Sequence, residues 1–97
     1  MDAHSSHDKI CKRSLISGRV QGVSFQYYTC KKAIALGLTG RVRNLPDGRV
    51  EALIQGDRAV VEAMSYWFWK GSPQSHVEAV ETEAQELQEF QAFEIQY

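Results

Sequence analysis

Hydrophobic and polar residues follow two different periods along this chain. Apolar side chains alternate with polar ones, or mix with them over short stretches, in a way typical of strands. The stretches are residues 9–17, 39–45, 49–55, 76–83 and 91–97. Two longer stretches, residues 25–36 and 58–70, repeat apolar positions at helical spacing. The chain is therefore expected to fold as strand, helix, two strands, helix and two strands.

The first predicted helix has clear ends. Gly37 follows its last turn and can adopt the left-handed conformation that closes many helices, while Leu38 can fold back on that turn. The stripe expected to face the core consists of Phe25, Tyr28, Lys32 or Ala33, and Leu36.

A hairpin is predicted between the second and third strands. Pro46-Asp47-Gly48 is a strong turn signal, because proline fixes φ and glycine supplies a left-handed position. In the following strand the apolar side consists of Val50, Ala52 and Ile54, and the polar side of Arg49, Glu51 and Gln55, with Leu53 interrupting the alternation.

The second predicted helix begins after Asp57, which can cap it, and ends at Gly71-Ser72-Pro73. A stripe of Val60 or Val61, Met64, Trp67 and Phe68 is interpreted as core and not as a cofactor site.

This order of elements predicts an α/β (α+β) ferredoxin-like sandwich, βαββαβ plus a C-terminal strand. Right-handed crossovers would place both helices on one face of a mainly antiparallel sheet. Residues 1–8 are expected to form a disordered or loosely held N-terminal arm, and residues 9–97 a single domain.

Composition narrows the function classes without choosing one. Hydrophobic residues make up 43% and charged residues 24% of the 97 positions, as in globular domains, and no apolar run is long enough to span a bilayer. No secretory signal is apparent, so a cytoplasmic protein is expected.

His4, His7 and His76 do not form a ligand cluster, and Cys11 and Cys30 lack metal-type spacing. Neither a metal nor a cofactor is predicted, and a disulfide between the two cysteines stays open.

Charge is unevenly distributed despite the net value of −1. Residues 1–50 carry nine Lys/Arg and three Asp/Glu, a balance of +6, whereas residues 51–97 carry two and nine, a balance of −7. The basic half either favours an anionic ligand or attracts the acidic half within one fold. The basic residues are scattered and RNA-binding signatures are missing, so a nucleic-acid partner is not expected.

Residues 18–25 connect a strand to the start of a helix and contain Gly18 and Gly22. Glycines allow tight turns whose amide groups point outward, and the helix N-terminus adds partial positive charge. The loop is thus a candidate anion cradle, with a plain strand-to-helix connection as the alternative. It matches neither the Walker loop nor the dinucleotide fingerprint.

Four segments, GRVQGVSFQYYT, GLTGRVRNLPDGRVE, WFWKGSPQSHV and FEIQY, resemble the acylphosphatase family over Ile10 to Tyr97. The resemblance implies a metal-independent and cofactor-independent hydrolase that cleaves the carboxyl–phosphate bond of acyl phosphates. It implies that Asn44 orients the attacking water. It also implies that the loop amides bind the phosphoryl group, at positions Arg19, Val20, Gln21, Gly22, Val23, Ser24 and Phe25.

One position departs from the family pattern. The family reads G-x-V-Q-G-V-x-F-R, and its final Arg binds phosphate and acts in catalysis, but here that position is Gln26. Gln offers two neutral donors where Arg offers a cation with a planar fork. Arg19, Arg41 and Arg43 are candidate replacements, although Arg41 and Arg43 have the opposite strand parity to Asn44.

The sequence therefore predicts an acylphosphatase with weak or abolished activity, whether Gln26 is natural or introduced. A non-catalytic anion-binding or interaction module on the same fold is the alternative, and a purely structural domain is a third. The expected ligands are a small acyl phosphate or inorganic phosphate or sulfate, bound by a monomer. Tyr27 or Tyr28 could stack on a substrate, but at least one is expected in the core.

Overall fold

A computed structural model describes residues 8–97 and contains every predicted element. The elements in chain order are β1 (Lys9–Arg19), α2 (Phe25–Ala35), β2 (Thr39–Asn44), β3 (Val50–Asp57), α3 (Arg58–Lys70), β4 (His76–Gln85) and β5 (Phe93–Gln96). The hairpin predicted around Gly48 is present, because Asn44 at the end of β2 pairs with Val50 at the start of β3.

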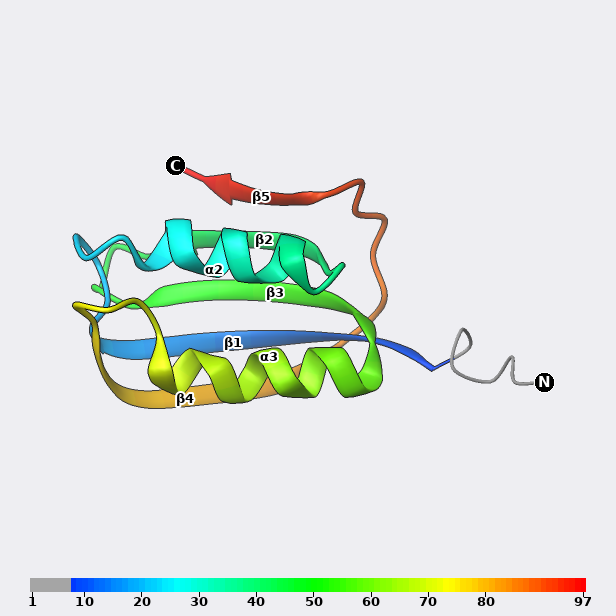
Figure 1. Ribbon diagram of the computed structural model, residues 1–97, viewed down its shortest axis with the longest axis horizontal. Helices are drawn as coiled ribbons and strands as arrows, with labels where there is room; N and C mark the ends of the chain where they lie inside the picture. Colours follow the sequence, from blue (N-terminus) through cyan, green and yellow to red (C-terminus); the bar gives the residue numbers. More distant parts are fainter. Residues whose placement is uncertain (1–7) are drawn as a thin grey trace.

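The five strands form one sheet in the order β4-β1-β3-β2-β5. Adjacent strands are antiparallel except β2 and β5, which are parallel. Both helices lie over the same face of the sheet (Figure 1). The ferredoxin-like sandwich predicted from the order of elements is confirmed.

The core lies between the helices and the sheet. From α3, the side chains of Val61, Met64 and Phe68 are fully buried, so the Met and aromatic stripe is core as predicted. Phe25 of α2 packs against Phe68 with ring centroids 6.4 Å apart. This contact anchors the start of α2 in the interior.

The capping predictions are confirmed at both helices. The Gly37 amide donates to Ile34 O at 3.0 Å and the Leu38 amide to Ala33 O at 2.9 Å, with Gly37 at φ 74°. This is the Schellman pattern, which satisfies the last carbonyls of a helix. Asp57 caps α3 by accepting from the Ala59 amide at 3.1 Å.

The predicted inner stripe of α2 is partly wrong. Thr29 is fully buried, whereas Tyr28 is only half-buried. Thr29 lies four residues after Phe25 and four before Ala33, so the helix buries the row of residues separated by four.

The sheet differs from the predicted alternation at β3, where every residue from Val50 to Gln55 is buried. Glu51 and Gln55 were assigned to a polar side, yet they are only 5% and 4% exposed. Gln55 is covered by the β4–β5 connection, because its amide donates to Gln88 O at 2.7 Å and its oxygen accepts from Gln88 N at 2.8 Å.

Several strands are longer than predicted. β1 does not end at Gly18 but continues to Arg19, because Gly18 still pairs with Val77 beyond a register shift. β3 extends to Asp57 and β4 to Gln85, whereas β5 is shorter and begins at Phe93.

Most of the predicted N-terminal arm, including His4 and His7, lies outside the described residues. Asp8, the last residue of that arm, accepts from Arg58 Nε at 2.9 Å. Cys11 and Cys30 are both free, and burial raises the pKa of each thiol. Over residues 8–97, no helix has the length and apolar character needed to cross a membrane. The same residues hold no cluster of metal-ligating side chains.

Candidate active site

The loop between β1 and α2 is anchored by its apolar side chains. Val20, Val23 and Phe25 are at most 6% exposed, so their side chains point into the core. Between them, Gly22 has φ 75° and Ser24 has φ 62°, both in the left-handed region. For a non-glycine residue such as Ser24 this conformation is uncommon and costs energy. The buried anchors thus impose a backbone shape that the loop would not adopt alone.

Side-chain hydrogen bonds hold the loop from two directions. Gln21 Nε2 donates to Leu45 O at 2.8 Å and to Arg49 O at 2.9 Å, which ties the loop to the β2–β3 hairpin. Ser72 Oγ donates to Val23 O at 2.8 Å from the loop that follows α3. The Gln21 side chain therefore fixes the position of the loop relative to Asn44, the last residue of β2.

The amide groups of this loop are available to a ligand. Over residues 8–97, the N–H groups from Gln21 to Gln26 donate to no protein acceptor, and the first helical bond is from Tyr28 N to Ser24 O at 3.1 Å. Free amides at a helix start carry partial positive charge. With left-handed turns beside them, they are suited to hold an anion.

A cleft of about 300 Å³ opens beside this loop. It brings together Gln26 and Asn44, which are separated along the chain and were predicted to share a site. Its lining consists of Val20, Gly22, Ser24, Phe25, Gln26, Tyr27, Asn44, Ile95 and Tyr97. Of the predicted phosphate-binding positions, Arg19, Gln21 and Val23 do not line the cleft.

Sequence reasoning did not assign Ile95 or Tyr97 to the site. Alternation along residues 91–97 indicated that they share one strand face, but no sequence signal indicated which loop that face would meet. The pairing of β5 with β2 decides it, because Val42 pairs with Ile95 and Arg43 with Gln96. Ile95 therefore lies on the same side of the sheet as Val42 and Asn44.

The cleft is lined by neutral side chains. Over the described part of the chain, no Lys or Arg is among its lining residues. Gln26 lies at the position where the family pattern has Arg, and its Nε2 donates to Gln96 O at 3.4 Å. The partial charges of the free amides are thus the positive groups that an anion in this cleft would meet.

The candidate replacement arginines lie elsewhere. Arg43 and Arg41 project from the face of the sheet opposite the helices, as their strand parity predicted. Arg43 Nε donates a hydrogen bond to Glu51, and Arg41 lines a separate cleft with Gln88 and Glu94. Arg19 is exposed at the end of β1, where it pairs with His76 of β4.

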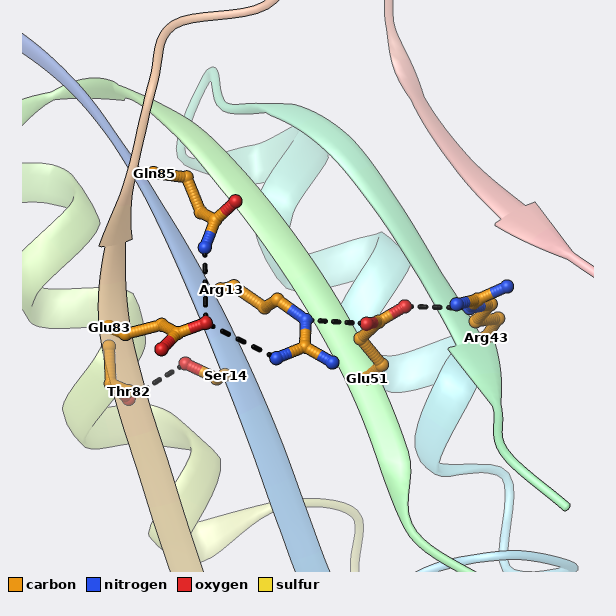
Figure 2. Close-up of polar contacts among 7 residues, drawn as sticks. All are labelled: Arg13, Ser14, Arg43, Glu51, Thr82, Glu83 and Gln85. Carbon is orange, nitrogen blue, oxygen red and sulfur yellow. Dashed lines mark hydrogen bonds and ion pairs between the residues drawn. The ribbon is translucent and has the colours of Figure 1, made fainter.

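Arg13, Arg43, Glu51 and Glu83 form an ion-pair network on this open face of the sheet (Figure 2). Glu51 accepts from Arg13 Nε and from Arg43 Nε, each at 2.6 Å, and its side chain is 6% exposed. Burial by itself would raise the pKa of Glu51, but the hydrogen bonds and charges of the two arginines outweigh burial and lower it. Arg13 also reaches Glu83 at 3.3 Å.

This network bears on the charge asymmetry of the sequence. Arg13 and Arg43 belong to the basic half of the chain, and Glu51 and Glu83 to the acidic half. Attraction between the halves, one of the two interpretations left open, therefore accounts for part of the asymmetry. The cationic side chains that were candidates for anion binding are partly used by the fold itself.

Comparison with known proteins decides the family. The Acylphosphatase family model matches residues 12–95. The chain belongs to the acylphosphatase family. It is 51% identical over 86 residues to an acylphosphatase from Acaryochloris marina, covering 89% of this chain and 92% of that protein. It is 53% identical over 85 residues to one from Nitrosococcus oceani, covering 88% and 96%.

A solved acylphosphatase structure from Coxiella burnetii shows the same fold. Its TM-score is 0.91 at 34% identity, covering 98% of this chain and 100% of that one. The acylphosphatase fold and the family predicted from the four sequence segments are thus confirmed, while the roles of individual residues remain proposals.

Proposed function

We propose that this chain is an acylphosphatase-type hydrolase of acyl phosphates whose turnover is weak or abolished because Gln26 replaces an Arg. The main support is the cleft itself, in which free loop amides, Gln26 and Asn44 meet. The proposed enzyme is a cytoplasmic monomer that acts on a small molecule without metal or cofactor. Neither a nucleic acid nor a membrane is a proposed partner.

In the proposed reaction, the phosphoryl oxygens accept hydrogen bonds from the free loop amides between Gln21 and Gln26. The Asn44 side chain holds a water molecule in line with the bond to be broken. The water oxygen forms a bond to phosphorus, and the bond from phosphorus to the carboxyl oxygen breaks. The carboxylate leaves with the electron pair, and the proton of the water passes to solvent. Because a carboxylic acid has a pKa near 4, its anion leaves without a general acid.

The neutral Gln26 explains why the reaction is expected to be slow. An Arg would place a fixed cation and two parallel donors against the transferring phosphoryl group. Loss of one such donor costs about 10²–10³ in rate, and loss of a phosphoryl-clamping Arg costs about 10³–10⁵ in other systems. The amides and Asn44 keep the binding geometry, but the charge that would stabilise the transition state is missing.

A phosphate-release assay with acetyl phosphate and benzoyl phosphate tests this proposal. We expect the unsubstituted chain to release phosphate at close to the uncatalysed rate, and Gln26→Arg to raise turnover by about 10²-fold or more. Gln91→Arg is the matched control, because it adds the same charge in the exposed β4–β5 connection, at the opposite end of the molecule (Figure 1). Turnover of the unchanged chain at an ordinary enzyme rate, about 1–10³ s⁻¹, would contradict it.

The intact amide cradle beside a neutral Gln26 also supports the alternative, a non-catalytic anion-binding module. Calorimetry with inorganic phosphate separates the two functions when it is combined with the assay. Phosphate binding with no gain of turnover in Gln26→Arg would favour the binding module and remove position 26 from a catalytic role.

A further inference from the structure

A cleft of about 440 Å³ lies beside the turn that follows α3, and we call it the α3-end cleft. Its lining consists of Tyr28, Trp67, Lys70, Gly71, Ser72, Pro73 and Ser75. The cleft that contains Gln26 and Asn44 is lined by other residues. In Figure 1 the start of α2 and the end of α3 lie at the same end of the molecule. The α3-end cleft is therefore built where side chains of both helices and the turn come together.

Two aromatic side chains form the apolar part of the α3-end cleft. Tyr28 and Trp67 are both half-buried, so each ring has one part packed in the protein and another part exposed. The Trp67 ring packs against Phe25 with centroids 6.1 Å apart. The Tyr28 ring meets Tyr27 edge-on, with centroids 5.2 Å apart. Because neighbouring rings hold them, Tyr28 and Trp67 offer fixed aromatic surfaces against which a flat aromatic ligand can pack.

The polar part of the α3-end cleft has one charged side chain, that of Lys70. Over residues 8–97, neither Asp nor Glu is among its lining residues. The hydroxyl groups of Ser72 and Ser75 donate to backbone carbonyls at 2.8 and 2.7 Å, so their hydrogens are already used. The carbonyls of Trp67 and Ser72 each accept from a backbone amide at 3.0 Å, which reduces the negative charge that they present. The Lys70 ammonium group therefore makes the cleft suited to an anion.

We propose that the α3-end cleft is a binding site for a small aromatic carboxylate. The ring of the ligand packs against Tyr28 and Trp67, and its carboxylate accepts a hydrogen bond from the Lys70 ammonium group. Ligand sites commonly combine an apolar wall with a few polar groups in this way. An aliphatic carboxylate would meet Lys70 without the aromatic contacts, and a neutral aromatic compound would meet the rings without the cation. The site is independent of the proposed hydrolysis.

The experiment must separate the α3-end cleft from the candidate active site, because the two are neighbours. Ser72 lines the α3-end cleft, and its Oγ donates to the carbonyl of Val23 in the loop between β1 and α2 at 2.8 Å. A Cβ atom on Gly71 would lie 2.7 Å from the Phe25 ring. An aromatic carboxylate could therefore bind on either side of this contact, at Lys70 or at the free loop amides.

The first test is a titration of the ¹⁵N-labelled, unsubstituted chain with benzoate, followed by amide NMR. We expect saturable shifts at residues 70–75, and a dissociation constant that Lys70→Gln raises by about two- to fivefold. Lys31→Gln is the matched control, because Lys31 is exposed on α2 and is not among the residues that line this cleft. Shifts confined to residues 21–26, the absence of saturable shifts, or equal weakening in both lysine variants would overturn the proposal.

The second test examines the aromatic part of the site. Cyclohexanecarboxylate has the same charge as benzoate and a similar size but no aromatic ring, so we expect it to bind about two- to tenfold more weakly. Tyr28→Leu should reduce this preference for benzoate. Tyr66→Leu should preserve it, because Tyr66 is 79% exposed on α3 and lines a different cleft. Equal affinity for the two carboxylates, or the same loss of preference in both tyrosine variants, would overturn the proposal and leave the proposed hydrolysis untouched.

Discussion

The two faces of the sheet use charge in opposite ways. On the open face, Glu51 is held between two arginines at 2.6 Å, and Arg13 reaches a second carboxylate. On the helix face, the cleft has no Lys or Arg in its lining over the described residues, and its donors are backbone amides. Adjacent residues of β2 lie on each side, since Arg43 belongs to the network and Asn44 to the cleft.

This difference shows that a basic sequence segment does not make a basic site. The first half of the chain has a charge balance of +6, yet strand parity directs Arg41 and Arg43 away from the cleft. The open face uses charge for stability, whereas in the proposed enzyme the cleft would need charge for catalysis. In the proposed enzyme, a change at position 26 is therefore expected to alter activity without altering the fold.

The largest effect on turnover is expected at Asn44, and its neighbour Arg43 on the opposite face provides the comparison. In the Gln26→Arg background, Asn44→Ala is expected to lower turnover of benzoyl phosphate by about 10²–10³-fold, because the attacking water loses its orienting group. Arg43→Ala is expected to change turnover by less than about threefold, since its side chain lies on the other face. Steady-state kinetics of both variants tests this contrast. Equal losses would show that the two faces are not functionally separate.

An intermediate effect is expected from the open face. Glu51→Ala removes two charge-assisted hydrogen bonds and should lower the free energy of unfolding by about 1–3 kcal/mol at pH 7. The half-exposed arginines then turn to solvent, which limits the loss.

The loss should also depend on pH in a defined direction. The pKa of Glu51 is lowered in the folded chain, so its stabilising contribution is present above the unfolded value near 4.3 and disappears as the pH falls through the folded value. Urea unfolding of the unsubstituted chain and of Glu51→Ala between pH 3 and 7 measures the difference in their free energies of unfolding. A difference that grows on acidification would contradict the assignment.

The smallest expected effect compares two glycines with positive φ. Gly22 in the cleft has φ 75° and Gly48 in the hairpin turn has φ 96°, and a Cβ atom at either would meet no atom within 4 Å. Replacement by Ala should therefore cost about 1–2 kcal/mol of backbone strain at both positions. Only Gly22→Ala adds a methyl group to the cleft wall, so only it should weaken phosphate binding measured by calorimetry. Equal phosphate affinity in the two variants would argue against the loop as the anion cradle.

Local signals in the sequence predicted much of the fold. Gly37 closed α2, Asp57 capped α3 and Pro46-Asp47-Gly48 formed the hairpin, because each acts on its own backbone or its near neighbours. The proximity of Gln26 and Asn44 was also predicted, but through the family resemblance and not through any local signal.

Predictions failed where distant segments decide burial. Gln55 was assigned to a polar side, but the β4–β5 connection covers it and bonds its amide. Glu51 was assigned likewise, but Arg13 of β1 and Arg43 of β2 neutralise it. The alternation of β3 itself does not reveal any of these partners, which come from other strands and from the β4–β5 connection.

The sequence by itself determined the order of elements, the caps of the two helices, the family and the neutral residue at position 26. These depend on local backbone chemistry and on the identity of residues, which the chain carries without its fold. The tertiary structure decided that Glu51 and Gln55 are buried, and that Ile95 of β5 joins the cleft wall. Strand pairing brings such distant residues together, and no period along the chain records that pairing.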